Sequence, residues 1–218
     1  MINMMFWKRW RAKKNPERSW QEGELNFVKS IEYYSGYSTQ TTYVLCDVDD
    51  VVNDYRNNQT SNYVYVTTNY NGKLYPMFDL DVLSKYNDFV RNFKEEKYVM
   101  FQSSPGHYWA IVDREFNSFN DFTRDPLIND WIVYTDKQYN DFTRYRKYFS
   151  CRGYFDEMNR QPVIIDKSDN LSDNFNEFIN KFDNYLQTTA LELSMLKYRK
   201  PDMLNLYKRQ RKLERILK

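Results

Sequence analysis

The sequence predicts an α/β (α+β) protein, and three observations support this prediction. Short runs rich in Val, Tyr, Thr and Phe recur between residues 41 and 135, and such runs are typical of β-strands. Residues 83–96 instead place apolar side chains at helical spacing, directly between two of these runs. From Leu171 onward apolar residues again recur every three or four positions, so the chain is expected to end in helices. With 218 residues, 41% of them apolar, the chain can form one large domain or two small ones.

The first part of the chain is predicted to contain a basic arm, one helix and three strands. Residues 1–19 read as an aromatic and basic arm, and 20–35 as a short helix. Strands are expected at 41–48, 63–68 and 73–82, and the segments between them carry turn residues such as Asn and Gly.

The middle of the chain predicts a β-α-β-turn-β unit. The strand at 73–82 leads into the helix at 83–96, a strand at 97–102, a turn at 103–106 and a strand at 107–113. Further strands are expected at 131–135, 144–150 and 162–166, then a long helix at 171–198 and a basic helix from Pro201. We therefore divide the chain into the arm, a main domain at 20–168, and a C-terminal helical segment with a basic tail at 169–218.

Composition and charge narrow the class of protein. Cys46, Cys151 and His107 are the only cysteines and histidine, too few for a Cys/His zinc site or a disulfide framework. No apolar run approaches the about 20 residues of a membrane span, and the N-terminus turns basic before any signal-peptide-like run, so we expect a cytoplasmic protein with no membrane contact.

Residues 1–19 carry net charge +5 and 197–218 carry +7, which leaves −10 in between. Basic ends suggest polyanion contacts, and an acidic body suggests cation binding.

Asp79 and Asp81 stand two residues apart in an otherwise apolar run, Met77–Leu83. Side chains at positions i and i+2 of a strand point to the same face, so both carboxylates would lie side by side. Adjacent carboxylates repel each other and are costly to bury without a partner. A pair of this kind fits a divalent cation such as Mg²⁺ or Mn²⁺, which prefers carboxylate oxygens.

Two further groups of polar residues follow this pair along the chain. The predicted turn carries Ser103 and Ser104 and leads into His107. Asp130 then precedes the apolar run 131–135, and a basic stretch follows it: Arg144, Arg146, Lys147 and Arg152. If 144–150 is a strand, Arg144 and Arg146 share one face and can neutralise phosphate charge, although a solvated edge strand is the alternative interpretation.

The order of these groups resembles the archaeo-eukaryotic primase superfamily, the primases and primase-polymerases, over about residues 73–153. Two features depart from the family pattern. The family places one residue between Ser or Gly and His, whereas His107 follows Gly106 directly, so Trp109 competes for that position. The segment from Asp130 to Arg144 is longer than the pattern implies, so Asp136 competes as the third acid.

The resemblance implies an RRM-like β-α-β catalytic sheet with an additional N-terminal α/β layer, and 20–168 as the catalytic domain. It implies a primase-polymerase that makes or extends primers by two-metal nucleotidyl transfer. Asp79, Asp81 and Asp130 would hold Mg²⁺ or Mn²⁺, with His107 also in the catalytic site. The triphosphate would contact the remaining predicted site residues: Ser103, Ser104, His107, Arg144, Arg146 and Lys147.

The implied partners are a single-stranded DNA template, a primer and nucleoside triphosphates. The chain has no GxxxxGK[ST] phosphate-binding loop, so any helicase would be a separate protein. Its Asn-, Tyr- and Lys-rich composition suits an AT-rich plasmid or virus.

Three other functions compete with this interpretation. Haloacid-dehalogenase phosphatases also use an Asp-x-Asp strand, but they need Gly-Thr where Val82-Leu83 stand here. Sugar-nucleotide glycosyltransferases would not explain the serine turn or the basic stretch. The third is a non-catalytic replication-initiation or single-stranded DNA-binding protein with a degenerate acidic cluster. Such a protein would bind DNA in EDTA, and its affinity for DNA would fall as the salt concentration rises.

Overall fold

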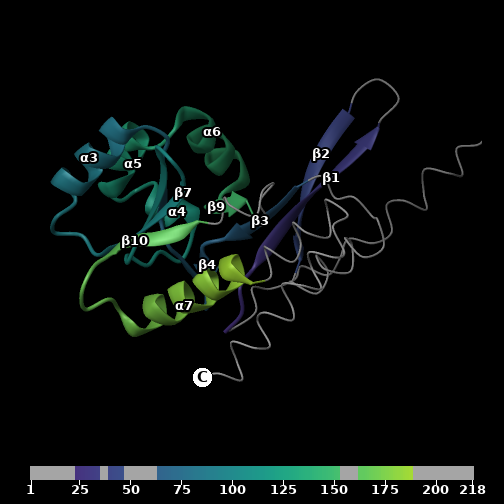
Figure 1. Ribbon diagram of the computed structural model, residues 1–218. Coiled ribbons are helices and arrows are strands. Elements are labelled where there is room, and N and C mark those ends of the chain that lie inside the picture. The colour runs from purple at the N-terminus through teal and green to yellow at the C-terminus, as the bar shows by residue number, and fades with distance from the viewer. Residues whose placement is uncertain (1–22, 35–38, 47–62, 153–161, 189–218) are drawn as a thin grey trace, which may run out of the picture.

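Two four-stranded antiparallel sheets and five helices make up the described part of this computed structural model, residues 23–34, 39–46, 63–152 and 162–188 (Figure 1). The mixed α and β content confirms the predicted class in general. One sheet has the order β2-β1-β3-β9, the other β10-β7-β8-β6, and β4 and β5 form a small separate hairpin. The strands are β1 (Phe27–Tyr34), β2 (Thr39–Cys46), β3 (Tyr63–Thr67), β4 (Asn69–Tyr70), β5 (Lys73–Leu74), β6 (Met77–Leu80), β7 (Tyr98–Ser104), β8 (His107–Val112), β9 (Ser150–Arg152) and β10 (Val163–Lys167). The helices are α3 (Leu83–Asn92), α4 (Phe119–Phe122), α5 (Leu127–Tyr134), α6 (Lys137–Arg146) and α7 (Asp173–Gln187).

The first sheet contains a strand where a helix was predicted. The prediction of a helix over 20–35 is wrong from Phe27 onward, because β1 pairs with β2 on one side and β3 on the other. Both neighbours supply backbone hydrogen bonds, and Phe27 and Val28 are buried. A short apolar run can form either a helix or a strand, and here the long-range pairing with β2 and β3 stabilises the strand. The β1–β2 hairpin extends away from the second sheet (Figure 1).

The second sheet contains the predicted β-α-β-turn-β unit. β6 and β7 each pair antiparallel with β8, so α3 connects two parallel strands that have β8 between them. Phe89 of α3 packs against Phe78 of β6 with ring centroids 5.1 Å apart. The single strand predicted at 73–82 is divided into β5 and β6 around Tyr75–Pro76, since proline has no N–H to donate to a ladder.

Two helices, α5 and α6, occupy segments for which strands were predicted. The strands predicted at 131–135 and 144–150 are wrong over 131–134, which belongs to α5, and over 144–146, which belongs to α6. The Val, Ile, Trp and Tyr content of 131–134 favours a strand, but tertiary packing overrides this preference. Trp131 is fully buried, and its Nε1–H donates to the Met77 carbonyl at 2.8 Å. That bond fixes α5 against β6.

The last described helix, α7, joins the two sheets. Its Phe182 packs on Phe101 of β7 (5.5 Å), and its Tyr185 packs on Phe27 of β1 (4.8 Å). The predicted helix at 171–198 is thus confirmed over Asp173–Gln187. Its continuation from 189, the basic helix from Pro201 and the arm at 1–19 lie outside the described residues.

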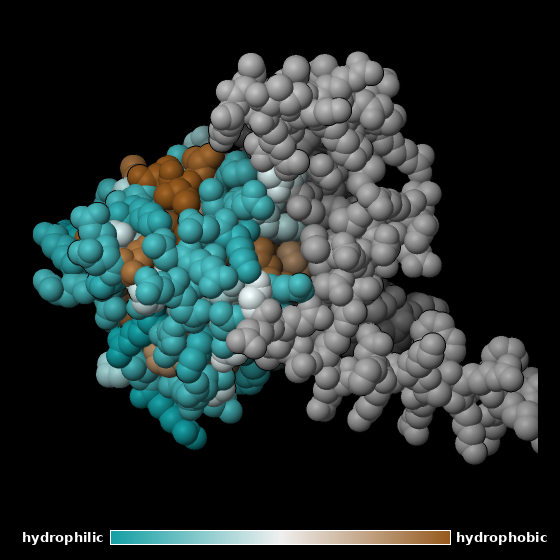
Figure 2. Space-filling model, turned by 90° about the horizontal axis from the view of Figure 1, so that it is seen from below, coloured by the Kyte–Doolittle hydropathy of each residue, from teal (hydrophilic) through white to brown (hydrophobic). Residues whose placement is uncertain are grey.

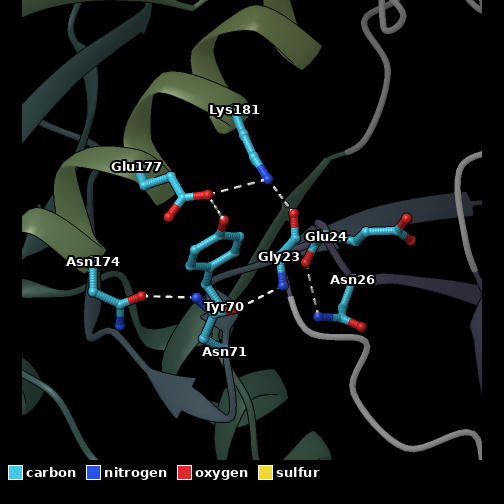
Figure 3. Close-up of polar contacts among 8 residues, drawn as sticks. All are labelled: Gly23, Glu24, Asn26, Tyr70, Asn71, Asn174, Glu177 and Lys181. Atoms are coloured by element: carbon cyan, nitrogen blue, oxygen red, sulfur yellow. Dashed lines mark hydrogen bonds and ion pairs between the residues drawn. The ribbon is translucent and has the colours of Figure 1, made fainter.

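A polar cluster also attaches the start of the described chain to α7 (Figure 3). The Tyr70 hydroxyl donates to Glu177 at 2.6 Å, and Lys181 lies 3.3 Å from the same carboxylate. The Lys181 amine also donates to the Gly23 carbonyl, and the Gly23 N–H donates to Asn71. These bonds hold the segment before β1 against the second half of the chain.

The face seen in Figure 2 is mostly hydrophilic, and it carries one larger hydrophobic patch and several smaller ones. Among the described residues, none of the helices has the length and apolar character needed to cross a membrane.

Candidate active site

Asp79, Asp81 and His107 come together where β6 ends and β8 begins. In the register of these strands Asp79 lies opposite Trp109 and Leu80 opposite Tyr108. The next pair would be Asp81 and His107, and Asp81 Oδ1 lies 3.1 Å from His107 Nδ1. Because faces alternate along a strand, all four of Asp79, Asp81, His107 and Trp109 belong to one face of the sheet.

The four side chains differ in exposure. The side chains of Asp81 and His107 are 40% and 50% exposed, and Asp79 is partly buried. Trp109 is buried in the core, where Phe101 is its partner on β7. A ligand from solvent can therefore reach His107 more easily than Trp109, which favours His107 for the position that the sequence left open between them.

The serines predicted to bind phosphate lie beside His107. Ser103 and Ser104 end β7, and Ser104 pairs with His107 across the hairpin. The Ser103 hydroxyl donates to the His107 carbonyl at 3.4 Å. Gly106 has φ = 83°, a left-handed conformation that favours glycine, and it allows the tight turn back into β8. The turn thereby places two hydroxyls at the same end of the sheet as the carboxylates.

Asp79 lies near α6 and β9. Burial raises the pKa of Tyr139 and of Cys151, and the negative charge of Asp79 raises both pKa values further. The Tyr139 hydroxyl also accepts a hydrogen bond from the Ser150 N–H at 3.1 Å. Both Tyr139 and Cys151 are therefore neutral neighbours of Asp79 near pH 7. Sequence reasoning missed Tyr139; its position three residues after a helix-capping Asp136 was the available signal.

Asp136 is the candidate acid whose backbone contacts Asp79. Its N–H donates to the Asp79 carbonyl at 2.9 Å. Its carboxylate caps α6, with Oδ1 accepting from the N–H groups of Gln138 (2.8 Å) and Tyr139 (3.1 Å). The helix cap thus places Asp136 beside β6.

Asp130 is placed differently. It lies exposed in the first turn of α5, next to Trp131, which contacts Met77 at the start of β6. The chain then runs through α5 to Asp136, whose N–H donates to the Asp79 carbonyl. Within residues 23–34, 39–46, 63–152 and 162–188, no three Asp, Glu, His or Cys side chains form a group that could hold a metal ion. The structure does not bring Asp130 to the carboxylate pair, and its metal role stays a prediction.

The predicted phosphate-binding cations occupy the end of a helix. Arg144 and Arg146 belong to α6, so they do not share a strand face, and that part of the prediction is wrong. Arg144 Nε donates to Asn140 at 2.6 Å. The Arg146 guanidinium lies 4.2 Å from the ring centroid of Tyr65, and the Lys147 amine lies 5.6 Å from that of Phe119. Arg152 belongs to β9.

Comparisons of this chain with protein-family models, with curated proteins and with solved structures found no match. Functional inference therefore depends on the chemistry of the site.

Proposed function

We propose that this protein is a nucleotidyltransferase of the primase-polymerase kind, which adds nucleotides to make or extend primers on a DNA template. The main support is the meeting of Asp79, Asp81 and His107 at one end of a sheet, with the serine turn alongside. The motif order that resembles the archaeo-eukaryotic primases gives the reaction class. The RRM-like arrangement of the β6–α3–β7–β8 unit belongs to this proposal, as does the role of the first sheet as an additional layer.

The carboxylate pair fits Mg²⁺ or Mn²⁺ by the chemistry of its donors. Asp79 and Asp81 present hard oxygen ligands on one sheet face, and Asp81 is accessible from solvent. When bound, two such cations would stabilise the attacking and leaving oxygens of the phosphoryl transfer. The family resemblance implies Asp130 as the third carboxylate, whereas the backbone contact with Asp79 favours Asp136.

The remaining residues of the site bind and orient the nucleotide. The contact with Asp81 orients the His107 ring. The hydroxyls of Ser103 and Ser104 and the imidazole can donate hydrogen bonds to triphosphate oxygens. The charges of Arg144, Arg146 and Lys147, at the C-terminal end of α6, would attract phosphates. The partners in this proposal are single-stranded DNA, a primer, nucleoside triphosphates and a separate helicase.

The test is incorporation of a labelled nucleotide on single-stranded DNA, with and without a primer, in Mg²⁺, Mn²⁺ or EDTA. Metal-dependent products are expected from the wild type and not from Asp79→Asn/Asp81→Asn. The matched control, Glu95→Gln/Asp169→Asn, removes the same charge from two exposed positions and should retain activity. Equal incorporation by wild type and the Asp79/Asp81 variant would overturn the proposed mechanism.

A second candidate is a non-catalytic single-stranded DNA-binding or replication-initiation protein. It is favoured by one observation: among the described residues, no three Asp, Glu, His or Cys side chains form a group that could hold a metal ion. Such a protein would give no product under any of the conditions above, yet would bind DNA in EDTA with strong salt dependence.

A further inference from the structure

Two large aromatic side chains on α6 point into solvent. Phe142 is 51% exposed and Tyr145 is 75% exposed. Residues three apart on a helix are surface neighbours, so the two rings form one patch. Most other large aromatic side chains of the described chain are instead buried in the core. Exposed apolar surface of this kind often marks a contact site.

Positive charge lies next to the aromatic pair. The Arg146 guanidinium lies 5.1 Å from the Phe142 ring centroid, and Arg144 belongs to the same last turn of α6. Four basic residues belong to α6 and its C-terminal cap: Lys137, Arg144, Arg146 and Lys147. The acids of the same stretch are Asp136, whose carboxylate caps the helix, and the exposed Asp141. The surface therefore combines stacking rings with a net positive charge.

The position of α6 links this surface to the carboxylate pair. The helix begins directly after Asp136, whose N–H donates to the Asp79 carbonyl. A ten-residue helix is about 15 Å long, so its last turn lies only a few nucleotides' length from Asp79. A strand that leaves the site along α6 would pass both rings.

We infer that the exposed face of α6 is a docking surface for single-stranded nucleic acid. Bases stack on Phe142 and Tyr145, and phosphates contact Arg144 and Arg146. Unpaired bases suit this surface because their faces are accessible, whereas those of a duplex are stacked on each other. The identification of the strand as the template rests on the proposed function. The binding itself depends only on the rings and charges of α6.

The inference is tested by fluorescence anisotropy of a labelled twenty-residue oligothymidine with the full chain in EDTA. Phe142→Leu/Tyr145→Leu keeps apolar side chains but removes both rings, and it should weaken binding by roughly tenfold or more. The slope of affinity against salt should stay the same, because the phosphate contacts remain. Phe142→Tyr/Tyr145→Phe keeps both rings and should bind like the wild type.

A matched control is available on α5. Ile132 and Val133 are 44% and 66% exposed, and Ile132→Ala/Val133→Ala should leave oligonucleotide affinity unchanged. A further variant, Arg144→Gln, should weaken binding and reduce the salt slope by about one. Thermal melting of each variant confirms that the exposed substitutions leave the fold intact.

The outcomes separate this inference from the proposed function. Ring-dependent oligonucleotide binding without any nucleotide incorporation supports the α6 surface and rejects the nucleotidyltransferase. Incorporation by a protein whose affinity does not depend on the rings rejects the α6 surface alone. Failure of the wild type to bind the oligonucleotide overturns the inference. So does binding by Phe142→Leu/Tyr145→Leu that is as tight as that of the wild type.

Discussion

At the scale of single residues, Asp79 and Asp81 are the unusual feature of their strand. Two carboxylates on one face of a sheet repel each other, and Asp79 also lies close to the buried Tyr139 and Cys151. A bound cation would relieve the repulsion between the two carboxylates. We therefore expect selection for function rather than for folding at these two positions.

The choice of third acid gives the first prediction. In the incorporation assay Asp136→Asn should lower activity at least about tenfold if Asp136 completes the metal site. Asparagine caps helices as well as aspartate does, so α6 and the melting temperature should be retained. Asp130→Asn is the matched variant, since Asp130 is exposed on α5. The reverse ranking of the two variants would assign the role to Asp130, as the resemblance implies.

Tyr98 gives a prediction about pH. Burial, and then the nearby charge of Asp166, raise the pKa of Tyr98 from 10.0 to about 12. Below pH 10 this tyrosine is neutral in both folded and unfolded chains. Between pH 10 and 12 it ionises mainly in the unfolded chain, so its contribution to the free energy of unfolding falls as pH rises.

The measurement for Tyr98 is urea denaturation at several values between pH 9 and 12. Relative to wild type, Tyr98→Phe should lose less stability as the pH rises. The variant also removes the 3.1 Å hydrogen bond from the Tyr98 hydroxyl to Asp166, which shifts its stability at pH 9. Parallel curves for the two proteins over this pH range would contradict the prediction.

At the scale of elements, the local part of the fold could be predicted from the sequence. The helix at α3 and the strands β7 and β8 follow from apolar spacing and from the Pro105-Gly106 turn between the strands. The juxtaposition of Asp79, Asp81 and His107 follows from the pairing of neighbouring strands. These features depend on contacts within about forty residues, and sequence patterns report such contacts well.

The elements that were missed depend on distant contacts. The helix α5 is fixed by Trp131, which bonds to Met77, 54 residues away. The strand β1 exists because β2 and β3 pair with it. Because α5 and α6 were expected to be strands, the positions of Asp130 and of Arg144 and Arg146 could not be predicted correctly.

The C-terminal end of α6 gives a prediction at this scale. Lys147 ends the helix with φ = 67°, a left-handed conformation that costs a non-glycine residue about 1–2 kcal/mol. Lys147→Gly should therefore be more stable than Lys147→Ala by about 1 kcal/mol, although both lose the contact with Phe119. In a strand the order would be reversed, since glycine weakens strands. Thermal or urea unfolding of the two variants decides between these outcomes.

At the scale of the whole molecule, α7 packs against both sheets, so we expect the sheets to unfold as one cooperative unit. Phe178 is fully buried and stacks on Tyr75 with ring centroids 5.3 Å apart, while Phe182 and Tyr185 reach the two sheets. Phe178→Ala should lower the free energy of unfolding by about 3–5 kcal/mol. Val133→Ala, at a position 66% exposed on α5, should change it by about 0.5 kcal/mol or less.

The same arrangement predicts how the chain unfolds. Circular dichroism and tryptophan fluorescence should report one coincident transition in both the wild type and Phe178→Ala. Two separate transitions would show that the sheets unfold independently and that α7 does not couple them.

In the proposed mechanism Asp79 and Asp81 together hold divalent cations, and the most direct test is titration with Mn²⁺ followed by electron paramagnetic resonance. With a nucleoside triphosphate present, the wild-type chain should bind Mn²⁺ more tightly than nucleotide alone does. Asp79→Asn/Asp81→Asn should lose this additional binding, whereas Glu95→Gln/Asp169→Asn should keep it. Mn²⁺ binding that is the same in wild type and in the Asp79→Asn/Asp81→Asn variant would contradict the claim.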